Sequence, residues 1–371
     1  MTARPRILHL STARSWRGGE NQLRILYREL EARGFKQRLM MPAGPALFRI
    51  KKEGVNVRQL TSKNPWLLID AFRVGRICKK EGIDIIHAHD AKAHSLGALA
   101  AEIFGAGAGL VVHRRVDNPI RQNFLSRWKY HCKSVRALIC VSDHIRKVVE
   151  KHTHIDPHKM HTVYSAVGSE DPKKEHPTDL RKQIGINPKT ILVGNLSALA
   201  EHKDPLNFIK TASRILEKRE DIRFVWVGGD DGMEDICRER IAEKKLQDKI
   251  HLIGFVENAA ALISQLDVFL FTSKTEGLGS VLLEAMRRKV PIVSTDAGGP
   301  SEIISHRETG WLAEVKNPGQ LAEGVLFFLE NADQAREVTT RANKQIESRF
   351  SPSEMARQVV EIYKKIHLKT N

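Results

Sequence analysis

The chain has 371 residues and an ordinary apolar content, which fits two domains of usual size, each with its own core. Its net charge of +16 lies entirely in the first half: residues 1–170 carry 30 Lys and Arg against 14 Asp and Glu, whereas residues 171–371 carry 30 of each. The sequence lacks the long apolar run of a membrane-spanning helix, a secretory signal pattern and any C-x-x-C pair, so we expect a cytoplasmic protein without disulfides or structural zinc.

Apolar strands alternate with amphipathic helices through the first half of the chain. Helices are predicted over 20–34, which Gly34 ends, and over 66–82. The strands between them are RILHLST (6–12), KQRLMMPA (36–43), IDIIHAHD (83–90), LVVHRRV (110–116) and ALICVSD (137–143). This order predicts βαβ units and a mostly parallel sheet.

The pattern breaks at SAVGSEDPKKEHPTD (165–179), whose composition indicates a linker, and then restarts. The predicted strands of the second half are TILVGNLS (190–197), IRFVWVGG (222–229), KIHLIGF (249–255), DVFLFTS (267–273) and PIVSTD (291–296). The fold class is therefore α/β, with two doubly wound parallel-sheet domains over 1–168 and 169–351. Ligands of such sheets bind at the carboxyl ends of the strands, and we expect the two domains to face a cleft.

The segment TEGLGSVLLE (275–284) places two carboxylates eight positions apart. Glu276 follows a predicted strand, and Glu284 lies in a helix predicted from about Gly279 to Lys289. If the interval is mostly helical, its rise is about 12 Å, roughly the reach from sugar to ribose in a nucleotide sugar. Backbone N–H groups of Gly277, Leu278 and Gly279 would suit a diphosphate, and the carboxylates would accept hydrogen bonds from hydroxyls. Taken alone, such a pair is more often a helix-start charge and a solvated helix residue.

The stretch from Thr275 to Leu312 resembles the donor-site signature of retaining glycosyltransferase family four, which has the GT-B fold. Weaker similarity runs along the whole chain, through WRGGEN (16–21), IIHAHD (85–90), VVHRRVD (111–117), VGNLSALAEHKD (193–204) and VWVGGDDG (225–232). The resemblance implies transfer of a sugar from a nucleoside-diphosphate sugar with retention of configuration, without a metal or a cofactor. It also implies that the last helix, within 352–371, packs back on the first domain.

The resemblance assigns roles in the second domain, where the donor binds. Glu284 would hold the ribose hydroxyls, and Glu276 would face the sugar. Gly277, Leu278 and Gly279 would contact sugar and diphosphate, and Lys203 would stabilise the leaving diphosphate. The family commonly has an Arg where this chain has Asn195. Either Lys203 then suffices at the diphosphate, or Arg114, Arg115 or another basic residue compensates.

The resemblance makes the first domain the acceptor-binding half. Gly18 and Gly19 would approach the diphosphate and the acceptor, since glycine permits close backbone contact. His113 ends a strand and matches a family histidine near the reacting centre. The candidate acceptor contacts are His89, Asp90, Arg114 and Arg115. In this class the departing phosphate oxygen can take the acceptor proton, so we name no protein nucleophile. Asp230 and Asp231 are interpreted as a turn, without a metal.

The basic first half favours an anionic partner. In 119–136, basic residues interleave with an apolar stripe; for Phe124 and Leu125 we expect packing on the sheet, although a basic amphipathic helix can also lie on a membrane. The working hypothesis is transfer from a UDP-sugar to a lipid-linked or phosphorylated glycan in lipopolysaccharide or other cell-surface polysaccharide synthesis, on the inner face of the cytoplasmic membrane. The alternatives are a nucleotide-sugar epimerase on the same fold and a nucleic-acid-binding protein.

Overall fold

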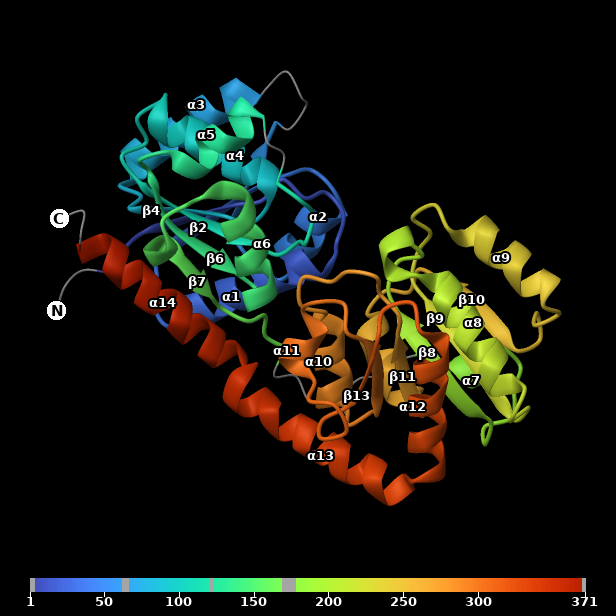
Figure 1. Ribbon diagram of the computed structural model, residues 1–371. Helices are drawn as coiled ribbons and strands as arrows, with labels where there is room; N and C mark the ends of the chain where they lie inside the picture. Colours follow the sequence, from blue (N-terminus) through green and yellow to red (C-terminus); the bar gives the residue numbers. More distant parts are fainter. Residues whose placement is uncertain (1–3, 62–66, 121–122, 169–177, 369–371) are drawn as a thin grey trace. The chain divides into compact units, whose positions relative to one another are not determined.

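The computed structural model describes residues 4–61, 67–120, 123–168 and 178–368. The chain forms two compact units, one comprising Met1–Ala166 with Pro352–Asn371 and the other Val167–Ser351. Each is a parallel sheet with helices on both faces (Figure 1). The unit boundary lies two residues before the one derived from the sequence. Most of the predicted linker, residues 169–177, lies outside the described residues.

The first unit contains a seven-stranded sheet in the order β3-β2-β1-β4-β5-β6-β7. Four of its strands, Ile7–Leu10, Ile85–Ala88, Gly109–Arg114 and Val135–Cys140, are buried over nearly their whole length, as expected for a parallel sheet that is covered on both faces. The strands are β1 (Ile7–Leu10), β2 (Gln37–Pro42), β3 (Val57–Leu60), β4 (Ile85–Ala88), β5 (Gly109–Arg114), β6 (Val135–Cys140) and β7 (Met160–Thr162), and the helices are α1 (Gly18–Ala32), α2 (Pro45–Lys52), α3 (Leu67–Glu81), α4 (Ala91–Glu102), α5 (Phe124–His131), α6 (Asp143–Thr153) and α14 (Pro352–Leu368).

Helix α14 covers the same face of this sheet as α1. Its buried residues, among them Val359, Tyr363 and Ile366, share one core cluster with Ile7 of β1 and Val111 of β5. The Nη2 atom of Arg33 also donates to Ser353 O at 2.9 Å. The predicted return of the last helix to the first domain is therefore observed, and it places Tyr363 beside the strand ends.

The second unit contains a six-stranded sheet in the order β10-β9-β8-β11-β12-β13. Its elements are α7 (Leu180–Gln183), β8 (Ile191–Leu196), α8 (Pro205–Leu216), β9 (Ile222–Val227), α9 (Glu234–Glu243), β10 (Ile250–Gly254), β11 (Val268–Phe271), α10 (Ser280–Arg287), β12 (Ile292–Thr295), α11 (Pro300–Ile303), β13 (Trp311–Ala313), α12 (Pro318–Glu330) and α13 (Ala332–Arg349), with 3₁₀ turns at Glu201–Lys203 and Ala259–Gln265. The helix predicted near Gly279 is confirmed as α10.

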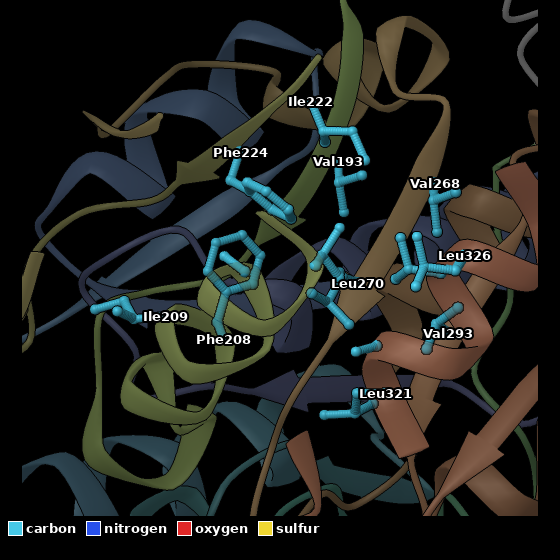
Figure 2. Packing of buried hydrophobic residues seen from close by; sticks show 14 of the residues in the cluster. Val193, Phe208, Ile209, Ile222, Phe224, Val268, Leu270, Val293, Leu321 and Leu326 are labelled. Carbon is cyan, nitrogen blue, oxygen red and sulfur yellow. The ribbon is translucent and has the colours of Figure 1, made fainter. Parts of the chain in front are cut away.

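Aromatic and branched side chains fill the space between this sheet and helices α8 and α12. Phe208 of α8 lies against Phe224 of β9, and Leu270 and Val293 of the central strands meet Leu321 of α12 (Figure 2). The ring centroids of Phe208 and Trp226 are 5.2 Å apart in an edge-to-face arrangement, a geometry that adds to the stabilisation from burial. This packing fixes β8 and β11, whose carboxyl ends carry the candidate donor-site loops.

The expected packing of Phe124 and Leu125 on the sheet is wrong. Their exposed fractions are 79% and 71%, and the buried residue of α5 is Tyr130. The helix begins only at Phe124, so both residues lie in its first turn, whereas Tyr130 in the last turn packs edge-on against His94 of α4 at 4.7 Å. Among the described residues, no helix has both the length and the hydropathy needed to cross a bilayer.

Candidate active site

Lys203 lies in the loop after β8 and is anchored to the end of β11. The buried hydroxyl of Thr272 donates to the carbonyl oxygens of Lys203 at 3.0 Å and Asp204 at 3.1 Å. Lys274 N donates to His202 O at 2.8 Å. The Lys203 ammonium forms an ion pair with Glu276 Oε2 and lies 5.5 Å from the centroid of the Phe271 ring. The fold thus holds a cation at the carboxyl ends of two adjacent strands.

The loop that carries Glu276 is joined to the loop after β12. Glu276 N donates to Ala297 O at 2.8 Å, and Gly299 N donates to Glu276 O at 3.0 Å. A Cβ atom on Gly299 would lie only 2.4 Å from Leu278 Cα, so the close approach of the two loops requires glycine there. Gly279, with a φ of +84°, then starts α10. The loop predicted to bind sugar and diphosphate therefore has a defined backbone.

Glu284 lies on α10 with its carboxylate held by two arginines of the same helix. Its Oε2 atom accepts from Arg288 Nη1 and, at 3.3 Å, from Arg287 Nη2. Within the described part of the chain, Oε1 of Glu284 accepts no hydrogen bond, and the same is true of Oε1 of Glu276. Each carboxylate is thus oriented through one oxygen, and the other oxygen is able to accept a hydrogen bond. The spacing of Glu284 and Arg288, four residues apart on a helix, could have indicated this pair from the sequence.

Asn195 was predicted to lie in the donor site, but its side chain is buried between two strands of the sheet. Its Nδ2 donates to Leu270 O at 2.7 Å, and its Oδ1 accepts from the Ser197 hydroxyl at 2.8 Å. The side chain therefore joins β8 to β11, and its carboxamide is directed into the sheet. Its geometry favours a structural role, supporting the loop that carries Lys203.

Four histidines meet at the carboxyl edge of the first sheet. His9 of β1 pairs in register with His87 of β4, and His113 of β5 lies on the same face. The rings of His87 and His113 are stacked with centroids 5.4 Å apart, and those of His87 and His89 are 4.2 Å apart. Burial lowers the pKa of His9 to about 4 and lowers the pKa values of the other three well below the usual value.

His89 and His113 were predicted site residues, whereas His9 was not singled out from the sequence. The missed signal is that histidine recurs in or at the end of three apolar strands: His9 in the first, His87 and His89 in the second, and His113 in the third. A parallel sheet brings equivalent positions of neighbouring strands together.

Arg115 lies among these histidines. Its Nη1 donates to His89 O at 2.9 Å, and its Nη2 lies 3.0 Å from His89 Nδ1 and 3.1 Å from His113 Nδ1. A Cβ atom on Gly19 would be 4.0 Å from Arg115 Cδ. The first turn of α1, which includes Gly18, Gly19 and Glu20, therefore lies beside the aliphatic end of the Arg115 side chain.

Asp90 and Arg114, two of the predicted acceptor contacts, are engaged within the unit. The Asp90 carboxylate caps α4 by accepting from Lys92 N and Ala93 N, and it also accepts from Thr12 N. Arg114 is buried and donates to Asn118 O, on the opposite face of β5 from His113 and Arg115. Both geometries favour structural roles, whereas Arg115 lies beside the glycine turn and contacts His113.

Nitrogens of His9, His87 and His89 lie close enough together to suggest a metal site, since they fall within 4.8 Å of one another. Yet His9 Nδ1 and His89 Nε2 share a hydrogen bond of 2.9 Å, and the guanidinium of Arg115 donates to the other nitrogen of His89. A neutral imidazole so engaged has no lone pair left for a cation.

In the GGDDG segment, Asp230 Oδ1 accepts from the backbone N–H of Gly232, Met233 and Glu234, which confirms the turn.

Comparison with known proteins identifies the class. The family model described as "Glycosyltransferase Family 4" matches residues 16–170, and that described as "Glycosyl transferases group 1" matches residues 177–345. Together they cover both units. The chain belongs to the family 4 glycosyltransferases and has the GT-B fold, and it is a transferase.

Particular relatives share part of the sequence. The N-acetyl-alpha-D-glucosaminyl L-malate synthase of Bacillus anthracis is 26% identical over 320 residues, covering 83% of this chain and 82% of the relative. The UDP-Gal:alpha-D-GlcNAc-diphosphoundecaprenol alpha-1,3-galactosyltransferase of Escherichia coli is 26% identical over 257 residues, 65% of each chain. Anabaena HepE, solved with UDP-glucose, is 20% identical and superposes with a TM-score of 0.83 over 97% of this chain and 99% of its own.

Proposed function

We propose that this glycosyltransferase uses a UDP-sugar and transfers the sugar, with retention of configuration, to a lipid-linked or phosphorylated glycan. The observation that carries the proposal is the geometry of the second unit. Lys203 stands beside Glu276 at the strand ends, and both Glu276 and Glu284 keep one carboxylate oxygen for hydroxyl donors. A diphosphate, a sugar and a ribose need this combination of one cation and two acceptors.

The names of two similar proteins support the choice of donor and acceptor. HepE was solved with UDP-glucose, and the E. coli relative is named for transfer from UDP-Gal to a diphosphoundecaprenol-linked sugar. We place the present enzyme in lipopolysaccharide or related surface-polysaccharide synthesis, at the inner face of the cytoplasmic membrane. The epimerase and nucleic-acid-binding alternatives gain no support from the relatives.

In the proposed reaction, the bond between the anomeric carbon and the diphosphate oxygen breaks as the acceptor oxygen bonds to that carbon on the same face. The departing diphosphate oxygen takes the acceptor proton. Lys203 stabilises the negative charge that develops on the diphosphate, a role that needs no metal ion. Glu284 holds the ribose, and Glu276 faces the sugar.

The choice of donor predicts a selective thermal shift. UDP and UDP-sugars at about 100 times their Kd should stabilise the folded protein by about 2.7 kcal/mol, because only the native state binds them. A panel of UDP, GDP and ADP with their common sugars measures this by melting temperature. A shift with GDP or ADP alone would correct the donor base, and no shift with any nucleotide would contradict the proposed function.

The proposed membrane partner has a candidate surface on helices α3, α4 and α5. These helices follow strands, so their first turns lie at the carboxyl edge of the sheet. Exposed apolar residues gather in this region, and basic residues outnumber acidic ones on the same helices. The exposed apolar residues are Leu67, Leu68, Ile69, Phe72, Phe124 and Leu125, and the basic residues are Arg73, Arg76, Lys79, Lys80, Lys92, Arg127 and Lys129.

The acidic residues of these helices do little to offset that charge. Asp70 is buried and accepts from Thr61 N, and Glu81 pairs with Arg38 and Arg58. Glu102, at the end of α4, accepts from Ser134 N at 2.7 Å. An apolar patch with surplus positive charge suits the surface of an anionic bilayer.

The membrane proposal predicts that Phe124→Ser/Leu125→Ser lowers the partition coefficient onto phosphatidylglycerol vesicles by roughly tenfold or more, because two exposed apolar side chains no longer insert. Vesicle sedimentation of the full chain measures this, with phosphatidylcholine vesicles for comparison. The matched control is Ile236→Ser/Phe255→Ser in the second unit, whose side chains are 46% and 75% exposed. Equal binding to both vesicle types, or equal loss in the control, would contradict the membrane proposal.

A further inference from the structure

A relay of hydrogen bonds runs from Gln37 to His113 and determines where each imidazole carries its proton. Gln37 Nε2 donates to Tyr27 O at 2.7 Å, so its Oε1 faces His9 Nε2 at 3.0 Å. An amide oxygen only accepts, and His9 Nε2 therefore carries the proton. His9 Nδ1 is then an acceptor.

The next steps of the relay follow from the same logic. His89 Nε2 lies 2.9 Å from His9 Nδ1 and must donate to it, which leaves His89 Nδ1 as an acceptor for Arg115 Nη2 at 3.0 Å. A guanidinium only donates. His113 Nδ1, 3.1 Å from the same Nη2, is therefore also an acceptor, and the neutral His113 ring carries its proton on Nε2.

Charge and burial keep the ring in this neutral form. Burial and the cation of Arg115 both lower the pKa of His113. The charged and titratable groups that face Arg115 from other elements are His9, Glu20, His87, His89, Asp90 and Tyr363. The hydroxyl oxygen of Tyr363, on α14, lies 2.6 Å from His87 Nδ1. This hydrogen bond holds the His87 ring in the stack.

We infer that Arg115 is a positioning residue that fixes His113 as a neutral Nε2–H donor, so that His113 gives a hydrogen bond to a substrate oxygen and does not remove a proton. This inference rests on the proposed function for the identity of the substrate, but the tautomer is a property of the protein alone. It fits a reaction in which the departing diphosphate oxygen takes the acceptor proton. It also explains why two consecutive arginines have different roles: Arg115 orients the histidines, whereas Arg114 packs on the other face of β5.

Long-range ¹H–¹⁵N correlation spectra of the full chain with ¹⁵N-labelled histidine test the tautomer without any substrate. His113, assigned by its loss in His113→Gln, should show the Nε2–H pattern unchanged from pH 6 to pH 8. In Arg115→Met, His113 should become a mixture of tautomers and titrate closer to its usual pKa, while His9, held by Gln37, keeps its pattern as a control for folding. An Nδ1–H or charged His113 in the native protein would overturn the inference.

Kinetics of the same variants give a second test. Arg115→Met should lower kcat by roughly 10- to 100-fold with KM for the donor changed by about twofold at most, because part of His113 then lacks the Nε2–H. Its rate should not fall at acidic pH as His113 protonates, because an imidazolium keeps its Nε2–H. His113→Gln, whose amide N–H can reach the Nε2 position, should retain about tenfold more activity than His113→Asn, which mimics the Nδ1 position. Equal activity of Gln and Asn would overturn the donor role. Absence of transfer from every nucleotide sugar would overturn the proposed function but not the tautomer.

Discussion

Replacing Lys203 with methionine should lower kcat by roughly 100- to 1,000-fold, the usual effect of removing one group that stabilises charge in a transition state. Methionine keeps much of the length and apolar stem of the side chain but removes its charge. The loop itself should persist, because Thr272 holds it through the backbone oxygens of Lys203 and Asp204. Steady-state release of UDP measures the effect.

Lys274→Met is the matched control for this prediction. Lys274 lies on the neighbouring loop and pairs with Glu201 at 3.4 Å, and no role in the reaction is assigned to it. Its loss should change kcat by about twofold at most, the effect of an exposed ion pair. If Lys203→Met kept more than about a third of the native rate, Lys203 would not be the group that stabilises the leaving diphosphate.

Glu284→Gln should weaken the binding of UDP by roughly 10- to 100-fold while leaving the fold intact. A hydrogen bond to a charged acceptor contributes about 1.5–3 kcal/mol, and the amide offers a weaker, neutral oxygen. Glutamine is preferred to alanine here because the side chain of Arg288 is only 1% exposed, and truncation would remove a partner of a buried cation. Titration calorimetry with UDP measures the affinity.

The control for Glu284 is Glu308→Gln, an exposed carboxylate of the same unit. Its affinity for UDP should equal that of the native protein. The melting temperatures of both variants without nucleotide should lie within a few degrees of the native value, so that a loss of affinity reports on the site. Unchanged UDP affinity in Glu284→Gln would remove Glu284 from the ribose site.

The sequence predicted the parts of the site that depend on local pattern. The strand before Ser273, the glycine turn and the helix that carries Glu284 all follow from periodicity and turn chemistry, which act over a few residues. The same is true of the glycine pair at the start of α1. The functional roles predicted for these residues came from the family resemblance.

Features that depend on tertiary packing were beyond the sequence. His9 and Gln37 are a lone histidine and a lone glutamine in apolar strands, and only the register of β1, β2 and β4 brings them to His89. Tyr363 reaches the site on a helix and lies 276 residues further along the chain than His87. The inward rotamer of Asn195 depends on Leu270 of a neighbouring strand. For His9 the recurrence of histidine in three apolar strands was the available signal, whereas the positions of Gln37 and Tyr363 and the rotamer of Asn195 leave no local signal in the sequence.

Transfer of label from UDP-¹⁴C-sugars into lipid tests the central claim most directly. The full chain is incubated with each labelled donor and an organic extract of bacterial membranes, and the label in the lipid phase is counted with the UDP released. The account predicts that at least one UDP-sugar labels the lipid with equal release of UDP, and that Lys203→Met slows both by roughly 100-fold or more. Folded protein that binds UDP but neither labels lipid nor releases UDP from any donor would contradict it.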